Sequence, residues 1–136
     1  MKQFRSFLAW CLVLIVLGGC CGCARNESDL SMETIAMAYR AAGYSVSCKW
    51  YDEPLDEGQI GYLQADHPDG DYIYFSFFAS EEDAEQYKDT YYHPGAMWLF
   101  SVIYGEPAWP QWRVYGSIVA EYEDRDLLEP LNQLMR

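Results

Sequence analysis

The side chains that could do chemistry in this chain are mostly carboxylates, which occur in pairs and short runs. Glu121 and Glu123 are two positions apart, so in a strand they would point to one face, about 7 Å from each other. Two carboxyl groups at that separation could act as general acid and base on a glycosidic bond. The chain has 21 Asp and Glu residues, however, and a solvated acidic face explains such a pair better. We therefore name no catalytic residue from it.

Two other acidic segments could collect a cation. Residues 66–71 (Asp-His-Pro-Asp-Gly-Asp) have the composition of an oxygen-rich calcium loop, but they lack the alternating ligands and the distal Glu of an EF-hand. Asp, Pro and Gly are also what a tight hairpin turn needs, and we expect a turn here. The acids between positions 52 and 57 could also collect a cation, but such a cluster is a weak signal for a metal site. The sequence thus predicts no metal and no cofactor.

Nucleophilic catalysis finds no support in the motifs. The sequence has no Gly-rich phosphate loop, no His-Glu-x-x-His and no Gly-x-Ser-x-Gly. Both histidines, His67 and His93, precede a proline in an expected turn, and a Ser-His-Asp triad would need one of them as its base. We therefore expect a protein that is not an enzyme. A carboxylate-based hydrolase of cell-wall or glycan material is kept as the alternative.

Aromatic residues gather in the second half of the chain. Seven Tyr and Trp residues fall between positions 91 and 115, around a proline-rich loop at 105–110. Tyr and Trp are favoured at binding surfaces because they bury a large area and keep a polar group. We expect Tyr104, Trp109 and Trp112 to contact a protein or glycan partner. The other interpretation is that most of these rings form the core of a small domain.

Charge and composition exclude two classes of protein. The formal net charge is −12, whereas nucleic-acid binding needs a basic surface that replaces phosphate counterions. An aromatic content of 17% is too high for a disordered chain. The sequence therefore predicts a folded, acidic domain that does not bind nucleic acid.

The N-terminus carries the most specific pattern. Lys2 and Arg5 precede an apolar run of eleven residues, 7–17, which is too short to span a bilayer and is typical of a secretory signal peptide. The following Leu17-Gly18-Gly19-Cys20 resembles the lipobox of bacterial lipoproteins. The resemblance implies cleavage before Cys20, acylation of its thiol with lipid chains such as palmitate, and attachment to the outer face of the cell membrane. An uncleaved anchor or an ordinary signal peptide is the alternative.

Cys48 is the one cysteine outside this N-terminal region. It alternates with Val46 and Trp50, which predicts a buried position on a strand. An exported protein could instead oxidise it to a disulfide with Cys21 or Cys23.

The elements that must position these residues follow from caps, turns and periodicity. We expect helices at 31–42, 80–91 and 127–135, and strands at 44–51, 60–65, 71–78, 97–104 and 113–122. The third strand is apolar on both faces and should be central. Sequential short strands favour an α+β fold with an antiparallel sheet of four to five strands and helices packed on one face, ferredoxin-like or a permuted relative.

The expected organisation is a lipoprotein signal peptide at 1–19, the lipidated Cys20 and a tether at 20–30, and one domain at 31–136. The function that fits this organisation is a lipid-anchored, extracytoplasmic binding domain. Besides the hydrolase, a structural accessory subunit of an envelope complex is an alternative. The ligand and the oligomeric state stay open.

Overall fold

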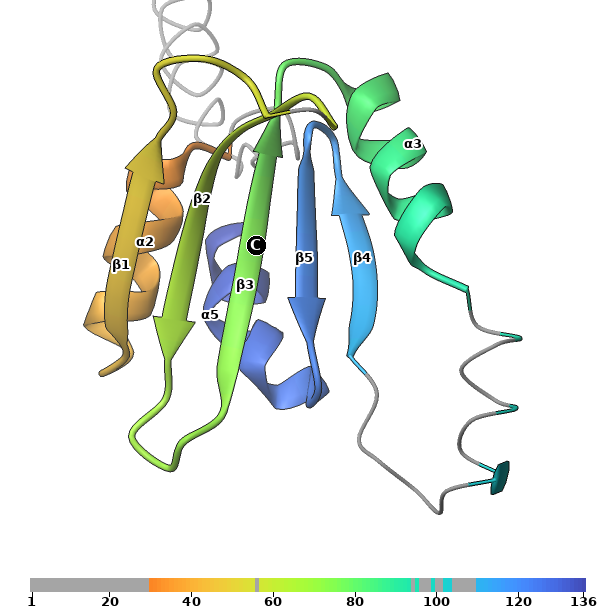
Figure 1. Cartoon of the computed structure of the whole chain (residues 1–136). Helices are drawn as coiled ribbons and strands as arrows, with labels where there is room; N and C mark the ends of the chain where they lie inside the picture. The colour runs from red at the N-terminus through yellow and green to blue at the C-terminus, as the bar shows by residue number, and fades with distance from the viewer. Residues whose placement is uncertain (1–29, 56, 94, 96–98, 100–101, 104–109) are drawn as a thin grey trace, which may run out of the picture.

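A computed structural model of the chain describes residues 30–55, 57–93, 95, 99, 102–103 and 110–136. Its centre is one five-stranded antiparallel sheet with the strand order β1-β2-β3-β5-β4 (Figure 1). The strands are β1 (Ser45–Trp50), β2 (Gln59–Asp66), β3 (Tyr72–Phe78), β4 (Gln111–Tyr115) and β5 (Ile118–Tyr122). The α+β class and the antiparallel sheet are confirmed, and β3 is the central strand as predicted.

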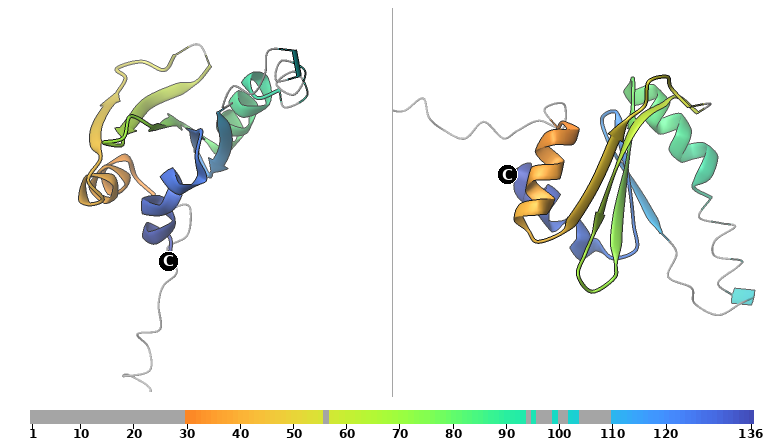
Figure 2. Two further views of the ribbon diagram at one scale, coloured as in Figure 1. Left: turned by 90° about the horizontal axis from the view of Figure 1, so that it is seen from below. Right: turned by 60° about the vertical axis from the view of Figure 1, so that its left-hand side comes forward.

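The helices lie on both faces of the sheet, which differs from the expectation of one face. Helix α2 (Met32–Ala41) packs on β1 and β2 and also against α5 (Glu129–Leu134). A single 3₁₀ turn, η2 (Arg125–Leu128), leads into α5. Helix α3 (Glu81–Tyr91) contacts β3, β4 and β5 and lies on the opposite side of the sheet from α2 and α5 (Figure 2). We call the side that carries α3 the outer face.

Local capping explains where α2 and α3 begin and confirms both predicted starts. The Ser31 hydroxyl accepts a hydrogen bond from the Thr34 amide at 3.2 Å, and the Ser31 amide donates to the Thr34 hydroxyl at 3.0 Å. At α3 the Ser80 hydroxyl accepts from the Asp83 amide at 3.1 Å. Both arrangements satisfy amides that a helix start leaves without intrahelical partners.

The main core lies between the sheet and the helices α2 and α5. Ile35 and Tyr39 of α2 are fully buried against Phe75 of β3 and Leu131 of α5. The Tyr39 hydroxyl donates to the Leu127 carbonyl at 2.8 Å, so its polar atom is satisfied inside the core. Burial raises the pKa of this phenol far above its usual range.

The end of the sheet differs from the expected strands. A strand was predicted over 113–122, but Gly116, with φ +58°, turns the chain between β4 and β5. A two-residue loop with positive φ at its first position only is the pattern of a type II′ hairpin. The strand predicted over 97–104 falls mostly outside the described residues. Its described positions, Leu99, Val102 and Ile103, are helical, so that prediction was wrong at these residues.

The topology is related to the ferredoxin-like arrangement in one half only. Strands β3 and β4 run parallel with β5 between them, and α3 follows β3 on the way to β4. This is one split β-α-β unit, whereas a ferredoxin-like fold has two. The other half is the meander β1-β2-β3, closed at residues 67–70 by the predicted turn, in which the Gly70 amide donates to the His67 carbonyl at 3.0 Å.

Candidate functional site

The outer face of the sheet presents a row of large side chains across three strands. Tyr74 of β3, Glu121 of β5 and Trp112 of β4 stand directly opposite one another in the ladder. Directly opposed residues in an antiparallel sheet point to the same face and lie within side-chain contact. In the next rows Tyr62 of β2 and Tyr72 of β3 point the same way. The strands therefore place an acid among aromatic rings on this face.

Five of these rings form two contacting groups with defined geometry. The rings of Tyr62 and Tyr74 are nearly parallel, with centroids 5.7 Å apart and 7° between their planes. Tyr51, just after β1, lies 6.1 Å from Tyr62. On the other side, Tyr87 of α3 stacks on Trp112 at 5.5 Å. We call the rings on this face the aromatic surface; its members are Tyr51, Tyr62, Tyr72, Tyr74, Tyr87 and Trp112.

Helix α3 covers only part of the outer face. Ala84 of α3 packs with Phe78 and Val119 in a small second core, and Tyr87 and Trp112 border it. Toward β1 the outward residues are small or polar, and they are exposed (Ser45, Ser47 and Lys49). The aromatic surface therefore runs from beneath α3 out to an open part of the sheet, and most of its rings are half-buried. Tyr72 is 42% exposed.

Burial raises the pKa values of several acidic groups on this surface. Burial raises the pKa of Tyr74 to about 12. The pKa of Tyr87 is raised by burial first and then by the charges of Glu121 and Glu57. Burial also raises the pKa of the Glu121 carboxyl. The phenols are therefore neutral at physiological pH, and each can act as a hydrogen-bond donor or acceptor.

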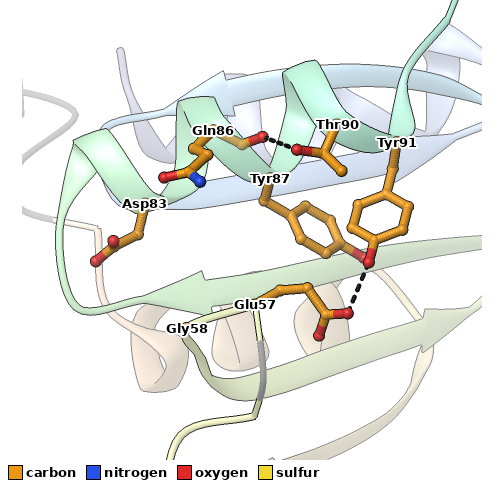
Figure 3. Close-up of a pocket in the computed structure, with 7 residues that line it drawn as sticks. All are labelled: Glu57, Gly58, Asp83, Gln86, Tyr87, Thr90 and Tyr91. Carbon is orange, nitrogen blue, oxygen red and sulfur yellow. Dashed lines mark hydrogen bonds between the residues drawn. The ribbon is translucent and has the colours of Figure 1, made fainter.

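A cavity of about 390 Å³ lies beside the aromatic surface, between α3 and the loop from β1 to β2. Figure 3 shows Tyr87 and Tyr91 pointing from α3 toward Glu57 of that loop, and the Tyr91 hydroxyl donates to Glu57 Oε1 at 2.6 Å. This bond ties the loop to the helix. The cavity is lined by Glu57, Gly58, Asp83, Gln86, Tyr87, Thr90 and Tyr91.

A second cavity is lined by Glu123 and not by Glu121. It measures about 470 Å³ and is lined by Asp71, Gln111, Glu123, Asp124 and Arg125. Strand β5 ends at Tyr122, so Glu123 lies beyond the strand and is exposed, while Glu121 stands between Tyr74 and Trp112. The two acids therefore share neither of these cavities, and they do not face each other as an acid and base across one cleft.

Of the three predicted partner-binding residues, the structure describes Trp112, which is half-buried on the aromatic surface. Tyr104, Trp109 and the proposed lipidation site Cys20 lie outside the described residues. Cys48 is exposed, so the prediction of a buried thiol was wrong. It pairs with Leu63 in the sheet, but β1 is an edge strand, and every residue of β1 except Val46 is exposed.

Most residues of the aromatic surface were not among the predicted site residues. Tyr72 and Tyr74 stand at alternate positions of β3, so the period-two pattern places them on one face, whereas only the register of β2 with β3 adds Tyr62. Glu57 carries no such signal, because only the packing of α3 brings Tyr91 to it.

Two further findings bear on the site. Within the described residues there is no group of three or more His, Cys, Asp or Glu placed to hold a metal ion. None of the helices in this part of the chain is both long and apolar enough to cross a membrane.

The chain matches no protein-family model, no curated protein and no solved structure.

Proposed function

We propose that this protein is a lipid-anchored, extracytoplasmic binding domain that holds a protein or glycan partner on its aromatic surface and does not act as a catalyst. The anchor in this proposal is Cys20, and the tether through residue 30 lets the domain reach its partner from the membrane. The aromatic surface carries the proposal, because it gathers six rings on one face and leaves them partly open to solvent.

The physical argument is that half-buried rings are already ordered. Neighbouring rings hold Tyr62 and Trp112 in place, so a partner that packs on them immobilises few additional rotamers. Tyr and Trp also supply large contact areas with a polar group. An aromatic face with packed rings is therefore suited to binding.

The test uses two single variants at exposed positions on opposite faces. Tyr72 is 42% exposed on the outer face, and Met37 is 61% exposed on α2. Neither substitution to Ser should lower the melting temperature appreciably. We expect Tyr72→Ser to reduce the recovery of partners with the full, lipidated chain from solubilised membranes, and Met37→Ser to leave it unchanged. Equal recovery with both variants would contradict the proposal.

One observation favours a second candidate, the carboxylate-based hydrolase. Glu121 is a half-buried carboxyl with a raised pKa among aromatic rings, and a general acid in glycoside hydrolysis needs such a pKa. If this candidate holds, purified protein should release fragments from cell-wall glycan, and Glu121→Gln should abolish the release. An absence of release with the wild-type protein would leave the binding function as the better account.

A further inference from the structure

We propose that the cavity between α3 and the loop from β1 to β2 binds a small organic cation that carries an alkylammonium group. The inference rests on the proposed binding function and names the class of ligand for the cavity beside the aromatic surface. Its basis is the combination of two carboxylates, two aromatic rings and a lining without any basic residue.

The charge of the cavity selects a cation. Glu57 and Asp83 line it, and none of its seven lining residues is Lys, Arg or His. Lys88 on the same helix is paired instead with Glu85 at 2.7 Å and with Asp89 at 3.7 Å. Glu57 accepts the Tyr91 hydroxyl at one oxygen, and a carboxylate has further acceptor capacity for a ligand. Asp83 Oδ2 accepts from the Ser80 hydroxyl at 2.7 Å, but both partners of the carboxylates are neutral hydroxyls, so an anionic ligand would meet like charge here.

The aromatic wall favours an organic cation. The rings of Tyr87 and Tyr91 lie 4.8 Å apart with 45° between their planes. They are too close to sandwich a ligand, and in Figure 3 both point from α3 toward the cavity side that holds Glu57. The π face of an aromatic ring attracts an ammonium group within about 6 Å of its centroid. An alkylammonium ion could therefore place its methylene or methyl groups on this wall and its charge near Glu57 or Asp83.

Size and ligand number argue against a bare metal ion. A volume of about 390 Å³ falls in the range of small-molecule sites. Calcium would need about six to eight oxygen ligands at close range, and the described residues hold no group of even three candidate ligand side chains. The cavity is therefore better matched to a molecule of several heavy atoms.

The experiment titrates the full chain in dodecyl maltoside with three probes. Choline carries a methylated ammonium and putrescine a primary one, whereas 3,3-dimethylbutanol has the shape of choline without its charge. We expect saturable calorimetric binding of at least one cation, and binding about tenfold weaker for the neutral probe. The stronger of the two cations then distinguishes a methylated from a primary ammonium ligand. Binding of the neutral probe equal to that of choline, or no saturable binding of either cation, would overturn the inference.

Matched variants locate the site. Glu57→Gln with Asp83→Asn removes both charges and keeps similar shapes, while Glu123→Gln removes one exposed charge from the second cavity. We expect the double variant to lose cation binding and Glu123→Gln to retain it; equal binding by both would overturn the assignment to this cavity. If the double variant does not fold, Tyr91→Phe serves as the second test. It keeps the aromatic ring and removes only the hydroxyl that binds Glu57, and it should weaken cation binding because the loop is no longer held to α3.

The same variants separate this inference from the proposed function. If the choline and putrescine titrations fail while Tyr72→Ser still reduces partner recovery, the cation site is wrong and the binding function stands. If the cations bind in the cavity but Tyr72→Ser changes nothing, the proposed role of the aromatic surface is wrong and the cation site stands.

Discussion

Replacement of Trp112 by Ala measures how much the aromatic surface contributes to the fold. The indole is half-buried, stacks on Tyr87 and Tyr92, and borders the small second core. A fully buried Trp or Phe costs about 3–5 kcal/mol when truncated to Ala. Because this ring is only partly buried, we expect a smaller loss of about 2 kcal/mol in the free energy of unfolding.

The indole N–H refines this expectation. Trp112 Nε1 is buried and finds no acceptor among the described residues, and an unsatisfied buried donor costs about 1–3 kcal/mol. Trp112→Phe keeps most of the stack and removes this donor. The smaller ring loses some packing, whereas removal of the unsatisfied donor stabilises the fold. We therefore expect the free energy of unfolding of Trp112→Phe to lie within about 1 kcal/mol of the wild-type value.

The assay is urea unfolding followed by circular dichroism, with melting temperatures as a second readout. A loss of about 2 kcal/mol corresponds to about 10 °C for a domain of this size. Leu131→Ala, at a position that is 1% exposed, is the control for full burial and should cost about 2–5 kcal/mol. An unchanged stability of Trp112→Ala would refute the packing argument. A loss for Trp112→Phe as large as for Trp112→Ala would refute the argument about the N–H.

Three other predictions test separate parts of the structure. Gly61→Ala should destabilise by about 1–3 kcal/mol in urea, because its Cβ would lie 2.6 Å from Trp50 Cε3 and 2.9 Å from the Lys49 carbonyl; normal stability would show that the sheet can shift. Since burial raises the pKa of Glu121, the folded protein holds this proton more tightly than the unfolded chain, and the free energy of unfolding falls as the pH rises through that pKa. Glu121→Gln should therefore be more stable than the wild type at pH 7 and equal to it at pH 3, and a difference that does not change with pH would contradict this. Mass spectrometry of the mature N-terminus should find an acylated Cys20, and any other first residue would refute the proposed anchor.

The helices are the part of the fold that local sequence predicts best. The hydroxyls of Ser31 and Ser80 cap α2 and α3 within one turn, and Gly43 adopts a φ of +93° after α2. These interactions depend on residues three or four positions apart. They can therefore be inferred without knowledge of the tertiary structure.

The errors have equally local explanations. Alternating apolar residues on both sides of Gly116 suggested one strand over 113–122, although a glycine inside such a pattern is also a signal for a turn or bulge. Leu99, Val102 and Ile103 follow the i, i+3, i+4 spacing of a helix, which the strand prediction overlooked.

The site was harder to predict than the fold, because distant segments build it. Trp112 was selected for its place near a proline-rich loop, but its described contacts are with Tyr87 and Tyr92, which precede that loop. Glu57 and Tyr91 are 34 positions apart and meet only because α3 packs over the sheet. Cys48 follows the predicted alternation and is still exposed, because burial depends on what covers an edge strand.

Site-specific photo-crosslinking in living cells tests the central claim most directly. A benzophenone side chain replaces Tyr62 on the aromatic surface in one strain and the exposed Met37 of α2 in another, both in the full, lipidated chain. We predict that light produces a discrete adduct from position 62, which protease or glycan-degrading enzymes then assign to a protein or a glycan, and none from position 37. Adducts of equal yield at both positions, or none at position 62, would contradict binding through the aromatic surface.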